Sequence, residues 1–170
     1  MKKLNLKGKR VLDMGAGTGA IAMIAAVNGA VTTAADINPA AVELCKRNSY
    51  TNSLEIEVVE SDLFSNLSDR QFDLVLFNVP FYPNPSSGLL DSAFNAGKNF
   101  EVIKRFACDV PLHLPDDGMV MIIFSEDSGF GQVTGLFDQA GLGIQQTVRK
   151  TAIFEHFHIV TFRRKNLPGR

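Results

Sequence analysis

A strand-like apolar run leads directly into three alternating glycines in Val11-Leu12-Asp13-Met14-Gly15-Ala16-Gly17-Thr18-Gly19. Glycine at such a junction permits a tight turn and lets a ligand approach the backbone closely. The same segment, read as Gly15-x-Gly17-x-x-Ala20, also fits the fingerprint of dinucleotide-binding proteins. On its own, this loop therefore leaves two ligands open, a nicotinamide cofactor and S-adenosylmethionine.

On both sides of this loop, short apolar runs alternate with helical patterns along the chain. Repeated alternation of this kind predicts a largely parallel sheet with right-handed crossovers. The last two runs are joined too tightly to be parallel, so they predict a terminal antiparallel hairpin. The predicted strands are 10–14, 31–36, 55–59, 72–78 and 119–125, the hairpin is 143–154 with 156–163, and the predicted helices are 18–28, 39–48, 99–114 and 130–140.

Length and composition bound the class of protein. A chain of 170 residues with 45% hydrophobic and 21% charged residues fits one globular domain over 1–170. Cys45 and Cys108 form neither a disulfide framework nor a metal-binding spacing, which predicts a reducing, cytoplasmic compartment. No apolar run reaches transmembrane length, so no membrane association is expected.

Charge is distributed unevenly along the chain. The net charge is −1, but basic residues concentrate in 1–10 and 149–170, and the body between them is acidic. We therefore expect basic tails at 1–9 and 164–170 and no basic stripe of the kind usual in nucleic-acid enzymes. Arg163-Arg164-Lys165 is predicted to be a solvated tail far from any ligand.

Polar residues recur where the predicted strands end, and ligands of open α/β sheets bind at the carboxyl ends of the strands. Asp13 precedes the glycines, where a dinucleotide fold usually carries an apolar residue, and Asp36 ends the second strand, where a carboxylate can bind a ribose diol. Asp62-Leu63 follows the third strand and could reach an adenine amino group. Asn78-Val79-Pro80-Phe81 follows the fourth strand and has no role in hydride transfer. Asp13, Asp62 and the 78–81 segment together favour S-adenosylmethionine.

These motifs resemble those of the class I S-adenosylmethionine-dependent methyltransferases, and residues 72–81 resemble the HemK/PrmC-like "methyltransferase small domain" group. The resemblance covers about residues 9–163. It implies an α/β fold with a Rossmann-like, seven-stranded, mostly parallel sheet, a terminal antiparallel hairpin strand and helices on both faces. Val79 replaces the proline usual in that group, but the expected acceptor there is a backbone carbonyl, which any residue supplies.

The resemblance also implies the roles of the site residues. The cofactor is S-adenosylmethionine and its product is S-adenosylhomocysteine. Asp36 would bind the ribose, Ile37 would pack on the adenine, and Asp62 would contact the adenine. The further cofactor-binding residues expected are Asp13, Gly15, Gly17, Gly19, Leu63 and Asn78.

The 78–81 segment suggests a catalytic arrangement for a flat, NH2-bearing acceptor. Asn78 Oδ1 and the carbonyl of Val79 can accept its two N–H bonds, and Phe81 can stack on its plane. The expected catalytic residues are these three and Pro80. Those acceptors bind more strongly as charge develops on the nitrogen, which stabilises the transition state. We expect no catalytic histidine and no metal. The 82–98 stretch that follows has no periodicity, and a loop of that length is usually functional.

The acceptor stays open at this stage. A protein glutamine and a nucleobase of rRNA, tRNA or DNA present the same planar nitrogen, and a small-molecule acceptor is a further alternative. Other classes are a non-catalytic cofactor-binding domain and an NAD-dependent oxidoreductase. We expect a macromolecular substrate whose recognition uses the 82–98 loop, a partner subunit or a separate recognition domain.

Some of these residues also have purely structural interpretations. Asp13 could cap a turn and Asp36 could cap the next helix. His113, His156 and His158 match neither a catalytic triad nor a metal site, so structural or surface positions are predicted for them.

Overall fold

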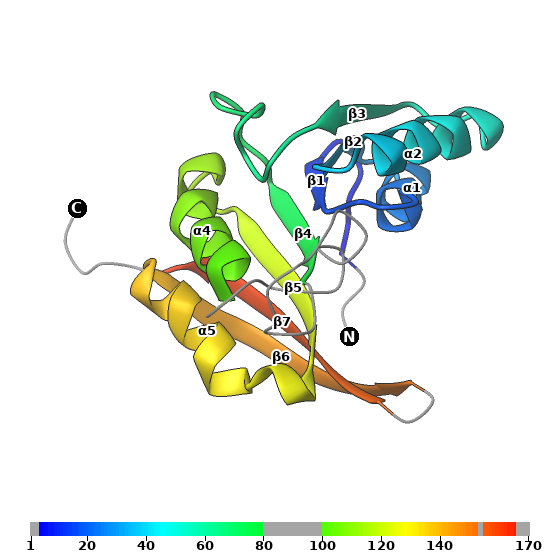
Figure 1. The fold of residues 1–170 in the computed structure, drawn as a ribbon. Coiled ribbons are helices and arrows are strands. Elements are labelled where there is room, and N and C mark those ends of the chain that lie inside the picture. Colours follow the sequence, from blue (N-terminus) through cyan, green and yellow to red (C-terminus); the bar gives the residue numbers. More distant parts are fainter. Residues whose placement is uncertain (1–3, 80–99, 153–154, 166–170) are drawn as a thin grey trace.

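A computed structural model describes residues 4–79, 100–152 and 155–165 of the chain. In these ranges it forms an α/β unit in which strands and helices alternate (Figure 1). The strands are β1 Arg10–Met14, β2 Val31–Asp36, β3 Ile56–Glu60, β4 Leu74–Asn78, β5 Met119–Ser125, β6 Leu142–Ala152 and β7 Glu155–Arg164. The α-helices are α1 Ala20–Val27, α2 Pro39–Thr51, α4 Glu101–Asp109 and α5 Phe130–Gln139, and the 3-10 helices are η2 Val110–His113 and η3 Glu126–Ser128.

The strands form one sheet in the order β3-β2-β1-β4-β5-β7-β6. The five strands from β3 to β5 pair in parallel, whereas β7 runs antiparallel to both β5 and β6. This arrangement confirms the predicted Rossmann-like sheet with its terminal hairpin. The strand order reverses beside β1, and a ligand crevice is expected at such a switch point, outside the carboxyl ends of the strands.

Helices cover both faces of the sheet, as predicted. On one face α1 packs through Ala25 against Val11 and Leu74. Cys45 of α2 packs beside α1 on that face, against Ala22. On the other face α4 and α5 pack against strand residues that alternate with those, among them Leu12, Met14, Val75 and Phe77. In Figure 1, α1 and α2 gather near β1 to β3, and α4 and α5 near β4 to β7. The alternation of side chains along each strand thus gives the sheet two apolar faces.

The largest core cluster contains a group of aromatic rings. Phe106 of α4 is fully buried, and its ring centroid lies 4.6 Å from that of Phe77 and 5.5 Å from that of Phe64. His113 stacks on Phe64 at 4.2 Å and its Nδ1 bonds the carbonyl oxygen of Arg70 at 2.8 Å. His113 is therefore a structural residue, as predicted.

Most predicted elements lie within a few residues of the observed ones, and the largest difference is at α4. The predicted helix 99–114 ends as an α-helix at Asp109 and continues as the 3-10 helix η2. Pro111 causes this change, because proline lacks the N–H that an α-helix would use. The predicted loop 82–98 lies outside the described residues.

The predicted tail at Arg163-Arg164-Lys165 lies where it was expected, but Arg163 and Arg164 belong to β7 and all three side chains bind other parts of the chain. Arg163 pairs with Met119 at the start of β5, so this end of β7 lies opposite the ligand edge. Arg164 donates to the carbonyl oxygens of Pro111 and Leu114, the latter at 3.1 Å. Lys165 forms an ion pair with Asp138 at 2.7 Å. These cations hold the ends of η2 and α5, where helices leave carbonyl groups unpaired.

No helix within the described residues is long and apolar enough to cross a membrane.

Candidate functional site

The glycine loop links β1 to α1 at the carboxyl edge of the sheet. Gly15, Gly17 and Gly19 all have positive φ, at 65°, 53° and 79°. Such values strain any residue that carries a Cβ. A Cβ on Gly19 would lie 2.4 Å from the sulfur of Cys45, and one on Gly15 would lie 3.4 Å from the ring of Phe77. The loop therefore needs glycine both for its turn and for its packing against α2 and β4.

Asp36 lies at the end of β2 and binds the glycine loop directly. Its Oδ2 accepts the N–H of Gly17 at 2.8 Å, and its Oδ1 accepts the N–H of Asn38 at 2.9 Å. Two backbone bonds fix the carboxylate, and each oxygen keeps a second lone pair for a ligand hydroxyl. The helix cap itself is Asn38, whose side chain accepts the N–H of Ala40. The structure thus places Asp36 where a ribose diol could bind, and the ribose contact stays a prediction.

Asp13 is buried beneath the loop, with 1% of its surface exposed. Its Oδ2 accepts the N–H of Ala22 in the first turn of α1 at 2.9 Å. Burial raises the pKa of Asp13 to about 7, the Ala22 bond opposes this shift, and the nearby charge of Asp36 adds to it. The carboxyl thus connects the end of β1 to the start of α1. Its direct contact with a cofactor stays a prediction.

Asp62 extends the line of carboxylates to β3. The N–H of Ser61 donates to the carbonyl oxygen of Asp36 at 2.9 Å. Asp62 is therefore the residue that follows the last backbone bond between β3 and the end of β2. Ile37, the residue after Asp36, is 48% exposed, which suits the predicted packing on an adenine. Leu63 has φ 50° and its side chain belongs to the core, so any part it has in the site falls to its backbone.

Arg105 of α4 makes a contact with a predicted site residue that the sequence did not reveal. Its Nη2 donates to Oδ2 of Asp62 at 2.8 Å, and this bond raises the pKa of Arg105. The two residues are 43 positions apart. The helical pattern of α4 places Arg105 on its exposed side, but no local signal pairs it with Asp62.

Asn78 and Val79 lie at the carboxyl end of β4, the strand between β1 and β5. Asn78 is exposed at the end of β4 and is in register with Ile123 of β5. Val79 is fully buried, and its N–H donates to the carbonyl oxygen of Ile123 at 2.9 Å. Asn78 is thus open to a ligand and directly follows Phe77, whose ring packs against Gly15. Pro80 and Phe81 lie outside the described residues.

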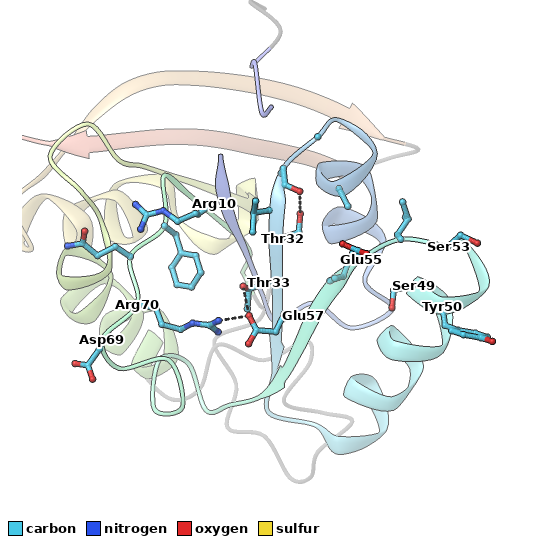
Figure 2. Close-up of a pocket in the computed structure, with 18 residues that line it drawn as sticks. Arg10, Thr32, Thr33, Ser49, Tyr50, Ser53, Glu55, Glu57, Asp69 and Arg70 are labelled. Atoms are coloured by element: carbon cyan, nitrogen blue, oxygen red, sulfur yellow. Dashed lines mark hydrogen bonds and ion pairs between the residues drawn. The ribbon is translucent and has the colours of Figure 1, made fainter. Parts of the chain in front are cut away.

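A broad groove lies at the opposite edge of the sheet. Its volume is about 1040 Å³, and it is lined by the starts of β1, β2 and β3 with the ends of α1 and α2 (Figure 2). Inside it, Arg70 pairs with Glu57, which also accepts from Thr33. None of the predicted site residues lines this groove. Within the described ranges no three His, Cys, Asp or Glu side chains are placed to hold a metal.

Fold and site together define a nucleotide-type cofactor site on a Rossmann-like sheet. Three carboxylates and a glycine loop lie along the ends of β1, β2 and β3, and an exposed amide lies at the end of β4. A family model described as methyltransferase small domain matches residues 1–155.

Two relatives and two solved structures show how widely this likeness extends. A protein from Methanocaldococcus jannaschii, provisionally named a protein N5-glutamine methyltransferase, is 34% identical over 163 residues, covering 92% of this chain and 82% of the relative. The release factor glutamine methyltransferase of Deinococcus radiodurans is 38% identical over 112 residues, covering 65% of this chain and 36% of the relative.

Among solved structures, the Thermus thermophilus 16S rRNA N2 G1207 methyltransferase, in complex with AdoMet and guanosine, has a TM-score of 0.72 at 21% identity and covers 94% of this chain and 38% of that one. The E. cuniculi Mtq2-Trm112 complex has a TM-score of 0.71 at 23% identity, with coverage of 94% and 87%. At these identities, the two structures establish the fold.

The chain belongs to the methyltransferase small domain family. It is an S-adenosylmethionine-dependent methyltransferase, as predicted.

Proposed function

We propose that this methyltransferase transfers the methyl group to a planar nitrogen and that its acceptor is the side-chain amide of a protein glutamine. The observation that carries this proposal is the position of Asn78. Its exposed amide ends β4 at the carboxyl edge, next to the strand residue that packs on the glycine loop. An acceptor held there lies beside the cofactor's loop.

The chemistry asked of the protein is positioning and charge stabilisation. S-adenosylmethionine supplies an electrophilic methyl group when it is bound. Asn78 Oδ1 and the Val79 carbonyl oxygen accept the two N–H bonds of the acceptor amide and orient its nitrogen. These bonds strengthen as the nitrogen becomes positive, so they favour the transition state over the ground state. Phe81 would stack on the amide plane, and positioning as a whole can contribute roughly 7–11 kcal/mol.

Two observations favour glutamine over a nucleobase. The relative that aligns over 92% of this chain is named for glutamine methylation, as is the Deinococcus radiodurans relative. The body of the chain between its basic ends is acidic, which opposes the neutralisation of phosphates that nucleic-acid binding requires. A nucleobase is the second candidate, since the Thermus thermophilus neighbour was solved with guanosine.

Recognition of a protein substrate would use more than the described residues. The chain spans 36% of the Deinococcus radiodurans enzyme, and the E. cuniculi neighbour was solved in a complex with Trm112. We propose that residues 1–170 form a single catalytic domain that acts in the cytoplasm and that a partner subunit or a further domain contributes to substrate recognition.

Labelled methyl transfer tests the acceptor. The chain is incubated with tritiated S-adenosylmethionine and, separately, a release factor, ribosomal proteins, rRNA, tRNA and DNA. We expect label in protein, and mass spectrometry should place it on a glutamine side chain. Label that enters only nucleic acid contradicts the glutamine proposal.

Asn78→Ala tests the role that the proposal assigns to the exposed amide of Asn78. Loss of one preorganised contact typically lowers kcat by about 10²–10³-fold. Calorimetry should show that the affinity for S-adenosylhomocysteine falls far less than kcat does, because the glycine loop and Asp36 still bind the cofactor. Asn28→Ala is the matched control, because Asn28 is an exposed amide at the end of α1. Methylation that persists in Asn78→Ala removes the assigned role.

A further inference from the structure

Asp62 lies at the far end of a line of polar groups along the carboxyl edge. The glycine loop follows β1, Asp36 ends β2, and Asp62 follows β3. Neighbouring strands are about 4.8 Å apart, so the line from β1 to β3 spans about 10 Å. A nucleoside that meets the glycine loop and lays its ribose on Asp36 therefore reaches β3 with its base. The chemistry of Asp62 suits a base that presents an N–H donor there.

The backbone at Asp62 is held firmly. The N–H of Ser65 donates to the carbonyl oxygen of Asp62 at 3.1 Å. The hydroxyl of Ser61 donates to the carbonyl oxygen of Leu63 at 2.7 Å and accepts the N–H of Asn66 at 3.1 Å. The burial of Leu63 anchors the turn in the core. The freedom that is left lies in the rotation of the Asp62 side chain.

Arg105 restricts that rotation. Its Nη2 bonds Oδ2 of Asp62 at 2.8 Å, so Oδ1 is the oxygen that can turn toward a ligand. Arg105 comes from α4, which is anchored by the fully buried side chains of Ile103 and Phe106. Asp109 lies one turn further along α4, and its charge also favours the cationic form of Arg105. A guanidinium on a packed helix gives the carboxylate a fixed direction.

We infer that Arg105 is a positioning residue that orients the Asp62 carboxylate to accept the exocyclic amino group of the cofactor's adenine. Arg105 therefore acts on base selectivity and not on the transfer step. This inference deepens the cofactor site on which the proposed function rests, and it concerns a residue that touches neither the methyl group nor the acceptor.

The exposure of the pair does not decide against this role. An ion pair with side chains 54% and 44% exposed contributes little to folding stability. Orientation of a hydrogen-bond acceptor is a separate property, and it needs only that one direction of the carboxylate is preferred. Lys165–Asp138 offers a matched control, because it is also an exposed pair, at 2.7 Å, and it lies at the opposite edge of the sheet.

The test compares two ligands that differ at one position of the base. S-adenosylhomocysteine carries the amino group, and S-inosylhomocysteine carries an oxygen in its place. A hydrogen bond to a charged group corresponds to a preference of about 10- to 100-fold, so calorimetry of the wild type should favour S-adenosylhomocysteine by that factor. Arg105→Ala should reduce the preference to about threefold or less. Asp62→Ala should abolish it, and Lys165→Ala should leave it unchanged.

Arg105→Lys separates direction from charge. It keeps the cation but loses the planar fork, so its preference should fall between those of the wild type and Arg105→Ala. In methyl transfer, Arg105→Ala should raise KM for S-adenosylmethionine and leave kcat near the wild-type value. A general loss of folding would instead weaken both ligands equally and lower the melting temperature.

The outcomes separate this inference from the proposed function. Full preference in Arg105→Ala, or in Asp62→Ala, overturns the inference and leaves the methyltransferase assignment intact. Equal binding of the two ligands by the wild type does the same. A wild-type chain that binds neither ligand removes the cofactor site itself, and with it both the inference and the proposed function.

Discussion

The buried carboxyl of Asp13 makes the stability of this protein depend on pH in an unusual direction. The pKa of Asp13 is raised from 3.8 to about 7, chiefly because burial disfavours the charged form. A raised pKa means that the folded state holds its proton more tightly than the unfolded chain. The contribution of this tighter proton binding to the free energy of unfolding is fully present below pH 3.8 and is lost as the pH rises through 7.

Asp13→Asn removes this dependence while keeping the geometry. Asparagine has a similar volume, and its Oδ1 can accept the N–H of Ala22. Each pKa unit corresponds to about 1.4 kcal/mol, so between pH 5 and pH 8 the wild type should lose about 2–3 kcal/mol relative to the variant.

Urea unfolding at the two pH values measures the difference. With a slope of about 1–3 kcal/mol per molar urea, the midpoint of the wild type relative to the variant should shift by about 1 M. The protein must be free of cofactor, because a cationic ligand would favour ionised Asp13. Asp116→Asn, at an exposed position, controls for the loss of one surface carboxylate. A difference between wild type and Asp13→Asn that stays constant within about 0.5 kcal/mol would refute the reasoning.

The glycine loop, the two cysteines and the aromatic core each lead to a further prediction. Gly19→Ala should lower the free energy of unfolding by about 2–5 kcal/mol and weaken the binding of S-adenosylhomocysteine, because its Cβ meets the sulfur of Cys45 and its φ is positive. The control Gly141→Ala, at φ 80° with open space around the Cβ, should lower it by only about 1–2 kcal/mol in the same urea titration. Iodoacetamide should label exposed Cys108 in the native protein and Cys45 only after unfolding, because Cys45 is buried and burial raises the pKa of its thiol; mass spectrometry checks this, and native labelling of Cys45 would contradict it. Phe106→Ala should cost about 3–5 kcal/mol in urea unfolding, since its ring is fully buried among three others, and a cost below about 1 kcal/mol would argue against that core.

The sequence predicts the parts of this structure that depend on local patterns. Residues 10–14, 31–36 and 119–125 are strands with the predicted bounds, because each is a short run rich in apolar or β-branched residues with a glycine within two residues of its start. The glycine spacing of 15–19 identifies the loop because only glycine tolerates its dihedral angles. Asp36 and Asn78 were placed correctly at strand ends, since that position follows from the strand itself.

Contacts between distant segments were beyond the reach of these patterns. The pairing of Arg105 with Asp62 can be predicted only when the packing of α4 is known. The polar residues on the exposed side of α4 are those of an ordinary solvated helix face. Arg164 illustrates the same limit: its place in a run of basic residues predicts a solvated tail, yet it donates to the carbonyl oxygens of Pro111 and Leu114. Periodicity locates a helix or strand in the sequence, whereas a contact depends on the position of that helix or strand in the tertiary structure.

The antiparallel course of β7 has a practical consequence for handling this enzyme. β1 begins and β7 ends at the same edge of the sheet, and the glycine loop and Asn78 lie at the other. A fluorescent reporter or a surface linker attached before β1 or after β7 would therefore leave the reactive edge facing the solution. Immobilised enzyme prepared in this way should keep the solution affinity for S-adenosylhomocysteine, which makes a sensor chip a natural format for screening acceptors.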